Sequence, residues 1–190
     1  MTDPRSQTAA NPSADAVIPR WATGVAAGLW AAGCRDVVYV PDNPLSHILA
    51  ALLRHHTEVR TLLAMREEEA LGIAAGLYLG GARPAVLMQS SGVGNTLNAL
   101  GSLLIPYQVP VMLVVSMRGD PGEWNSAQVP MGRAVAPVLD AFGVQHLTVE
   151  RDEEAEGKVL ALASLAFGTR LPAACLLPRR LTVPVRGGVA

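Results

Sequence analysis

The chain has 190 residues and a formal net charge of −1, with half of its residues hydrophobic and 16% charged. This length fits one domain with a substantial core. The near-neutral charge balance gives no electrostatic surface for nucleic acid or an anionic membrane, so we expect neither as a partner. The low charged fraction fits a surface partly covered by another chain, or else a bias of composition toward Ala, Gly and Arg.

Residues 1–15 are polar and lack the apolar core of a signal peptide, so we expect a disordered tail there. No run of about 18 apolar residues suggests a membrane span. Cys34 and Cys175 are isolated and show no CxxC spacing, which favours two buried thiols in a reducing compartment. The sequence therefore predicts a cytoplasmic protein.

The remaining residues alternate between helix and strand patterns. We expect helices over residues 16–33, 44–56, 68–81, 94–105, 132–142 and 152–168, with Asn43 capping the second. We expect strands over residues 36–41, 59–65, 83–89, 109–116, 144–149 and 172–178. Nearly continuous apolar strands between helices are typical of a parallel sheet covered on both faces. The predicted fold is one doubly wound α/β domain with about six parallel strands flanked by helices.

In such folds ligands gather beyond the carboxyl ends of the strands. The segments that follow four of the predicted strands read PDNP (41–44), REEEA (66–70), QSSGVGN (89–95) and RGDPGEWNSAQ (118–128). Unusual polar residues of the chain are concentrated in these four segments, which are therefore the candidate site.

Three glutamates open the third helix, and helical phasing of about 100° per residue separates them. Glu67 projects into the apolar stripe of that helix, Glu68 lies about 100° away, and Glu69 faces solvent. The stripe consists of Ala70, Leu71, Ala74, Leu77 and Tyr78. A buried carboxylate is costly unless it is compensated, so Glu67 is a candidate functional residue. The alternative is that Glu67 curls back to cap its own helix.

Gly92 and Gly94, in the segment QSSGVGN, allow the backbone to approach a ligand closely at the start of a helix. The segment lacks the third glycine of a dinucleotide fingerprint and the Gly-Lys-Ser/Thr ending of a P-loop. A tight strand-to-helix turn is the alternative interpretation.

Asp42 follows a strand, where it is either a functional carboxylate or a turn and helix-cap residue. Arg118 and Gln128 lie in a Gly/Pro-rich segment that is typical of binding loops and of exposed loops alike. His47 and His146 have no partner at metal-ligand spacing, so we assign no metal to this chain.

Taken together, the segments VPD, REEEALGIAAG, MQSSGVGNTLNAL and RGDPGE resemble, in order and spacing, the pyrimidine-binding (Pyr) domain of thiamine-diphosphate enzymes. The resemblance runs from about Trp21 to Pro178 and is most specific for the sulfopyruvate and phosphonopyruvate decarboxylases. It implies a single Pyr-type domain over residues 16–190.

The resemblance also implies roles for individual residues. Glu67 matches the activating glutamate, whose carboxylate hydrogen-bonds N1′ of the cofactor aminopyrimidine and so promotes removal of the thiazolium C2 proton. The matched cofactor-binding residues are Glu67, Ser91, Gly92, Gly94 and Asn95, and the matched substrate residues are Asp42, Arg118 and Gln128. Arg118 would hold an anionic sulfonate or phosphonate, or alternatively stabilise its loop.

The Gly-Asp-Gly motif that holds Mg²⁺ and the diphosphate in this family is absent from the chain. The resemblance therefore implies a partner β subunit that carries the diphosphate-binding domain and the metal, with thiamine diphosphate shared in an α₂β₂ or larger assembly.

The implied function is the α subunit of a 2-oxoacid decarboxylase that converts sulfopyruvate to sulfoacetaldehyde and CO₂, or acts on a phosphonopyruvate-like substrate. Other 2-oxoacids, acyloin formation, a non-catalytic assembly subunit and a nucleotide-binding Rossmann-like protein are the alternatives.

Overall fold

The computed structural model describes residues 17–183, so the expected tail at residues 1–15 lies outside the described residues. Within that range the strands are β1 (Asp36–Tyr39), β2 (Arg60–Leu63), β3 (Pro84–Gln89), β4 (Met112–Ser116), β5 (Gln145–Thr148) and β6 (Ala173–Leu177). They form one sheet in the order β2-β1-β3-β4-β6-β5, and every neighbouring pair is parallel. The predicted six-stranded, doubly wound α/β fold is confirmed.

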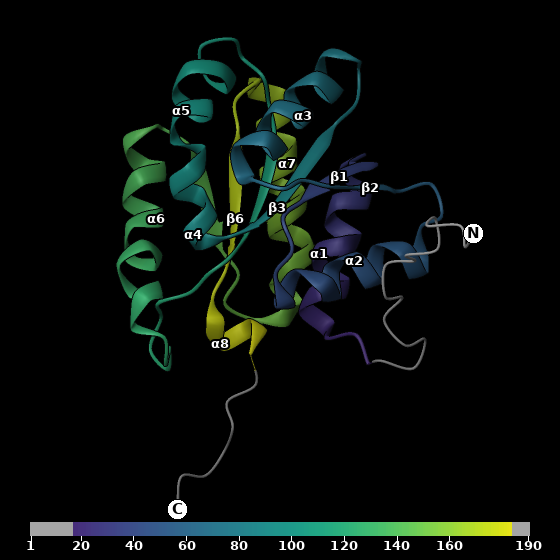
Figure 1. Ribbon diagram of the computed structural model, residues 1–190. Coiled ribbons are helices and arrows are strands. Elements are labelled where there is room, and N and C mark those ends of the chain that lie inside the picture. Colours follow the sequence, from purple (N-terminus) through teal and green to yellow (C-terminus); the bar gives the residue numbers. More distant parts are fainter. Residues whose placement is uncertain (1–16, 184–190) are drawn as a thin grey trace, which may run out of the picture.

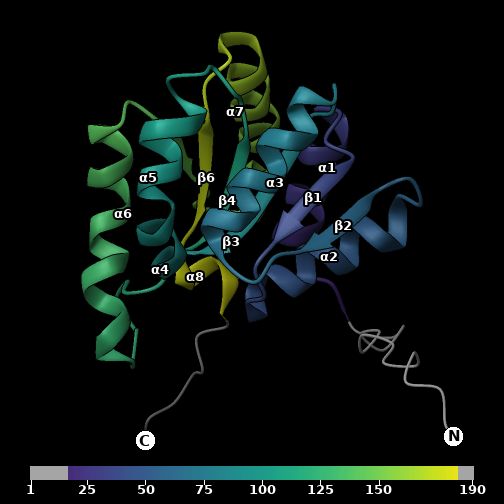
Figure 2. The same ribbon diagram turned by 45° about the horizontal axis from the view of Figure 1, so that its top comes forward.

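Helices cover both faces of this sheet (Figures 1 and 2). One face packs against α1 (Arg20–Ala31), α2 (Asn43–His55) and α7 (Ala155–Thr169), which follows the short turn η4 (Asp152–Glu154). The other face packs against α3 (Glu67–Leu79), η2 (Leu100–Leu104) and α6 (Val129–Ala141), which follows η3 (Ser126–Gln128). A short helix, α8 (Arg179–Thr182), follows β6.

Alternation of side chains along the strands divides the core into two layers. Val37 and Val114 face the layer of α1, α2 and α7, whereas their neighbours Val38 and Val115 face the opposite layer. The inner strands β4 and β6 are buried along their whole length, while the edge strands β2 and β5 are partly exposed. The continuous apolar runs in the sequence therefore mark the centre of the sheet.

The first two helices begin at different positions from those predicted. α1 begins at Arg20 instead of residue 16, and Val17 lies outside it and is exposed. Pro19 is the extended cap residue, and a residue that precedes a proline disfavours the helical region. At α2 the cap position belongs to Asp42, and Asn43 is already the first helical residue.

The helix predicted over residues 94–105 starts earlier and is broken. It consists of α4 (Ser90–Val93), η1 (Gly94–Thr96), α5 (Leu97–Ala99) and the π-helical turn η2. Glycines lower the helical preference of this segment. A Cβ atom on Gly101 would lie 2.7 Å from Cε1 of Phe142, so this segment packs closely against the end of α6.

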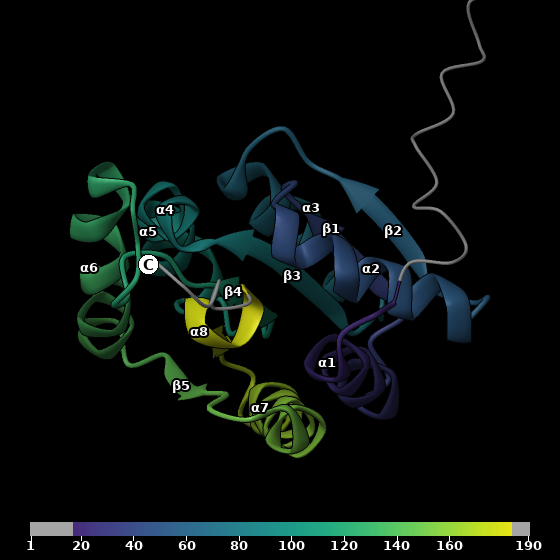
Figure 3. The same ribbon diagram turned by 90° about the horizontal axis from the view of Figure 1, so that it is seen from below.

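The order in which the strands are added to the sheet reverses at β1. β2 lies on one side of β1, whereas β3, the next strand in sequence, lies on its other side. In open α/β sheets such a point, at the carboxyl ends of the strands, is the usual place for a ligand. Figure 3 is seen from below and shows α8 near the middle of this edge. Among residues 17–183, every helix is too short or too polar to span a bilayer.

Candidate functional site

Glu67 opens α3 and lies directly against α4, the short helix that follows β3. Its half-buried side chain accepts a 2.9 Å hydrogen bond at Oε2 from Nδ2 of Asn95. A Cβ atom on Gly92 would lie 2.4 Å from Cγ, Cδ and Oε1 of Glu67, so only glycine fits here without movement of the carboxylate. The glycine-rich segment is already helical, with Gly92 in α4 and Gly94 in η1, and the close approach of α4 to Glu67 explains the glycine at position 92.

Glu69, and not Glu67, turns back over the start of the helix. Its Oε2 accepts a 2.8 Å hydrogen bond from the backbone N–H of Met65. Met65 precedes the cap residue Arg66, whose own side chain makes no capping bond, so the contact resembles half of a capping box shifted by one residue. The alternative in which Glu67 caps its helix is therefore wrong, and the carboxylate of Glu67 remains directed toward Gly92.

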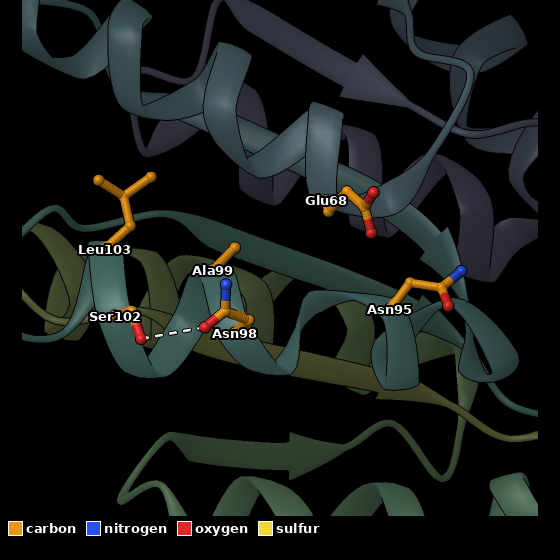
Figure 4. Close-up of a pocket in the computed structure, with 6 residues that line it drawn as sticks. All are labelled: Glu68, Asn95, Asn98, Ala99, Ser102 and Leu103. Carbon is orange, nitrogen blue, oxygen red and sulfur yellow. Dashed lines mark hydrogen bonds between the residues drawn. The ribbon is translucent and has the colours of Figure 1, made fainter.

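Glu68 takes a third position, at the side of a shallow groove (Figure 4). It forms an exposed ion pair with Arg66, with Nη1 and Oε1 3.4 Å apart. The groove has a volume of about 570 Å³ and lies between the start of α3 and the segment from η1 to η2. Its lining residues are Glu68, Asn95, Asn98, Ala99, Ser102 and Leu103.

Asp42 connects the ends of three strands. Although it occupies the cap position of α2, its side chain makes no capping bond. Instead, Oδ1 accepts a 3.1 Å hydrogen bond from Nε2 of Gln89, and Oδ2 accepts a 2.6 Å bond from Oγ of Ser116. The hydroxyl of Ser91 donates to Oε1 of Gln89 at 2.7 Å, which fixes the amide so that its NH₂ group faces Asp42.

Gln89 and Ser116 were not predicted as site residues. Ser116 is a fully buried hydroxyl at the end of the apolar strand MLVVS. The signal in the sequence was a serine at the end of an apolar strand. A polar side chain buried at such a position needs a hydrogen-bond partner.

Arg118 is held by Glu123 within its own loop. Its Nε and Nη2 lie 2.7 Å and 2.9 Å from the two carboxylate oxygens, and the side chain of Glu123 is only 1% exposed. The hydrogen bond from Arg118, with further bonds from the N–H groups of Asn125 and Gly119, lowers the pKa of Glu123 to about 2. The same hydrogen bond raises the pKa of Arg118, and Asp42 adds a smaller rise. These contacts agree with the interpretation of Arg118 as a residue that stabilises its loop.

The loop is also fastened to its neighbours. The N–H of Arg118 donates to Oγ of Ser90 at 3.1 Å, and the N–H of Arg179 donates to Oδ2 of Asp120 at 3.0 Å. A Cβ atom on Gly132 would lie 1.8 Å from the carbonyl oxygen of Arg118, so α6 and the loop are in backbone contact.

Arg179 is a further site residue that the sequence did not indicate. Its Nε lies 3.6 Å from Oε2 of Glu123, and its side chain is 17% exposed. Gln128 lies in the same loop, and its buried Oε1 has no hydrogen-bond partner among the described residues. The loop therefore contains an unsatisfied acceptor, Gln128, and contacts a largely buried cation, Arg179 of α8.

The structure brings together only some of the residues predicted to bind the cofactor. Gly92 and Asn95 contact Glu67, whereas Ser91 contacts Gln89 and Gly94 lies against Met131 of α6. Within residues 17–183, no three His, Cys, Asp or Glu side chains gather as a metal site. Cys34 and Cys175 are both buried, as predicted.

Doubly wound α/β domains usually bind ligands at a switch point beyond the carboxyl ends of the strands, and here the carboxylate of Glu67 is held against the glycine of α4 at that edge. The family model described as the thiamine pyrophosphate enzyme, N-terminal TPP binding domain, matches residues 20–126. The chain therefore belongs to this family, which confirms the resemblance inferred from the sequence motifs. The match includes Asp42, Glu67, Gly92, Asn95 and Arg118.

Curated relatives include α subunits of sulfopyruvate decarboxylase. That of Methanocaldococcus jannaschii is 39% identical over 137 residues, which are 72% of this chain and 80% of the relative. That of Methanothermobacter thermautotrophicus is 37% identical over 153 residues, or 80% of this chain and 92% of the relative. Phosphonopyruvate decarboxylase of Streptomyces viridochromogenes is 34% identical over 83% of this chain but only 40% of its own length.

Among solved structures, 2-oxoglutarate:ferredoxin oxidoreductase from Magnetococcus marinus has a similar fold, with a TM-score of 0.68 and 15% sequence identity. The match covers 85% of this chain and 29% of that chain.

Proposed function

We propose that this chain is the α (Pyr) subunit of a heteromeric, thiamine-diphosphate-dependent 2-oxoacid decarboxylase that acts on sulfopyruvate or a phosphonopyruvate-like substrate. The observation that carries the proposal is the carboxylate of Glu67, which Asn95 holds against Gly92 at the switch point of the sheet. Similarity to the sulfopyruvate and phosphonopyruvate decarboxylases supports the substrate class.

The residues around Glu67 fit the aminopyrimidine of the cofactor. Asn95 occupies Oε2, while Oε1 accepts no hydrogen bond from any described residue and is available to an N–H of a ring. The missing side chain of Gly92 is what lets the carboxylate of Glu67 lie against the backbone of α4. When bound, thiamine diphosphate supplies the electron sink that decarboxylation of a 2-oxoacid needs. Glu67 would contribute a fixed acceptor for the proton on the aminopyrimidine.

Asp42, which follows β1, and Gln128, at the end of η3, would face the substrate. The hydrogen bonds from Gln89 and Ser116 orient the carboxylate of Asp42, so that its position does not depend on the substrate. Gln128 offers a buried carbonyl oxygen that a hydrogen-bond donor of the partner subunit would satisfy.

A partner β subunit would supply the diphosphate-binding half and Mg²⁺. The chain covers most of the length of the sulfopyruvate decarboxylase α subunits but 40% of phosphonopyruvate decarboxylase, which supports a site completed by another polypeptide. Met65 and Trp124, both 81% exposed, lie in segments that follow β2 and β4. Exposed apolar side chains beside a site are typical of surfaces that another chain covers. The assembly would be α₂β₂ or larger.

The proposal is tested by co-expressing the chain with its partner subunit and measuring CO₂ release from sulfopyruvate. We expect Glu67→Gln to lower the rate by about a hundredfold or more, because the amide is a poor proton acceptor. Glu58→Gln, at an exposed position preceding β2, is the matched control and should retain the activity. Near wild-type activity of Glu67→Gln would refute the mechanism.

The remaining alternatives give different results in the same complex. If the complex releases acyloins or prefers another 2-oxoacid, the proposed cofactor stands and the proposed reaction is wrong. A partner subunit that is equally active without this chain would indicate a non-catalytic assembly subunit. Tight NAD binding by the chain would favour the nucleotide-binding alternative.

A further inference from the structure

Arg179 is a largely buried cation whose hydrogen-bonding capacity is not used by the protein. Its only side-chain partner among residues 17–183 is Glu123, at 3.6 Å, a distance too long for a good hydrogen bond. A guanidinium carries five N–H donors and cannot be deprotonated in proteins. Among the described residues the one buried side-chain polar atom without a partner is Oε1 of Gln128, so the unused N–H donors of Arg179 reach the surface and are open to an acceptor from outside the chain.

Glu123 cannot satisfy Arg179, because other groups already fill its carboxylate. Its two oxygens accept two bonds from Arg118 and one each from the N–H groups of Gly119 and Asn125. A carboxylate has about four lone-pair positions, so these four bonds exhaust it. Glu123 therefore draws Arg179 toward Arg118 electrostatically and leaves its donors available.

The two arginines occupy equivalent positions on adjacent strands. Arg118 lies two residues beyond Ser116 of β4, and Arg179 lies two residues beyond Leu177 of β6. Ser116 and Leu177 are paired in the sheet register, so the two chains leave the sheet side by side. Nη1 of Arg118 also makes no hydrogen bond to a described residue, so both guanidiniums have unused donors at one place.

This place adjoins the site of the proposed reaction. Ser116 binds Asp42 directly, and the N–H of Arg118 binds Ser90, two residues before Gly92. The carboxylate of Asp120 binds the backbone N–H of Arg179 and forms no ion pair with its guanidinium. A substrate that extends from Asp42 along the carboxyl edge of the sheet toward β6 would therefore contact Arg118 and Arg179.

We propose that Arg118 and Arg179 form a binding site for the anionic tail of the substrate, a sulfonate or phosphonate, and that Glu123 is the positioning residue that holds the two guanidiniums together. This inference rests on the proposed function. Planar guanidiniums bind tetrahedral oxyanions through two parallel N–H donors, and two of them facing one anion select a charged tail over a neutral one. Arg179 lies outside the region that matches the family model.

The test compares three substrates in the co-expressed complex: sulfopyruvate, phosphonopyruvate and pyruvate, which lacks the charged tail. Arg179 is the residue to change, because its side chain makes no hydrogen bond that holds the loop. We expect Arg179→Gln to raise KM for the two anionic substrates by roughly tenfold or more and to leave KM for pyruvate within about twofold. Arg179→Lys should restore part of the loss.

Arg180→Gln is the matched control, because Arg180 is the next residue in α8, is 52% exposed and pairs with Glu150. It should leave all three KM values unchanged, and thermal unfolding should show that each variant is folded. Equal effects of Arg179→Gln on all three substrates, or no effect on any, would overturn the inference and leave the proposed function standing. A wild-type complex that accepts pyruvate and neither anionic substrate would overturn the inference and the proposed substrate class, and would leave only the 2-oxoacid decarboxylase activity standing. A wild-type complex that decarboxylates no 2-oxoacid would overturn both.

Discussion

The hydroxyl of Ser116 donates a 2.6 Å hydrogen bond to Oδ2 of Asp42 across 74 residues of sequence. Ser116 is fully buried at the end of β4, so this bond fixes a carboxylate of the β1 end from inside the sheet. A hydrogen bond to a charged group contributes about 1.5–3 kcal/mol. Ser116 therefore orients Asp42 without itself being accessible to a substrate.

Removing the hydroxyl of Ser116 should lower the activity only because Asp42 is then less well oriented. We expect Ser116→Ala to reduce the rate of decarboxylation by about tenfold, since Asp42 then retains only the bond from Gln89. In a background that already carries Asp42→Asn, the same change should cost less than about twofold. Measuring the four rates forms a double-mutant cycle, and additive losses would show that Ser116 does not act through Asp42.

A methyl group on Gly92 should displace the carboxylate of Glu67. Because the added Cβ atom would lie 2.4 Å from three atoms of that side chain, Gly92→Ala should abolish most of the activity of the complex. Gly72→Ala is the control: it lies on the exposed side of α3, where an added Cβ meets nothing within 4 Å. It should keep the activity and raise the free energy of unfolding by about 0.5–1 kcal/mol. Full activity of Gly92→Ala would show that the position of Glu67 is unimportant.

Lowering the pH should weaken the contacts by which Glu123 stabilises its loop, and so lower the free energy of unfolding. The pKa of Glu123 in the folded chain is about 2, below its ordinary value of 4.5, so its ionised form stabilises the fold above that ordinary value. This contribution is lost as the pH falls from about 5 toward 2. Urea unfolding over this pH range should show a shallower loss of stability for Glu123→Gln than for the wild type. Glu153→Gln changes an exposed carboxylate and should follow the wild-type curve.

The two cysteines should be protected from thiol reagents in the folded state. Burial raises the pKa of both Cys34 and Cys175 to about 12, so almost no thiolate exists at pH 8. A thiol reagent should label neither residue until denaturant is added, and labelling should then follow unfolding. Ser46→Cys, at an exposed position on α2, should react at once. Rapid labelling of the native wild-type chain would contradict the buried positions.

The fold could be predicted because its signals are local. Runs such as the β4 segment MLVVS are apolar over their whole length, and this is the mark of a strand buried on both faces. Helical phasing placed Glu67 on the inner side of α3 because only its own helix was needed for the argument. The four segments after the strands were identified as the candidate site for the same reason.

The partners within the site could not be predicted, because they depend on the tertiary structure. Asp42 meets Gln89 and Ser116 only after β1, β3 and β4 have aligned, and a capping aspartate has the same local sequence. Arg179 follows the last strand in a short segment without periodicity, so nothing in the sequence connects it to Glu123. The break in the helix after β3 depends on contacts such as that of Gly101 with Phe142.

The hydrogen bonds that shape the carboxyl edge join residues far apart in the chain: 28 positions for Glu67 and Asn95, and 59 for Asp120 and Arg179. Loop-closure entropy must be overcome before such contacts stabilise the structure. During synthesis, the pair between Glu123 and Arg179 cannot form until β6 has emerged from the ribosome and docked beside β4. The end of the sheet that we propose to bind the anionic tail is therefore completed only when the last strand has been made, and a nascent chain that lacks β6 would have no such site.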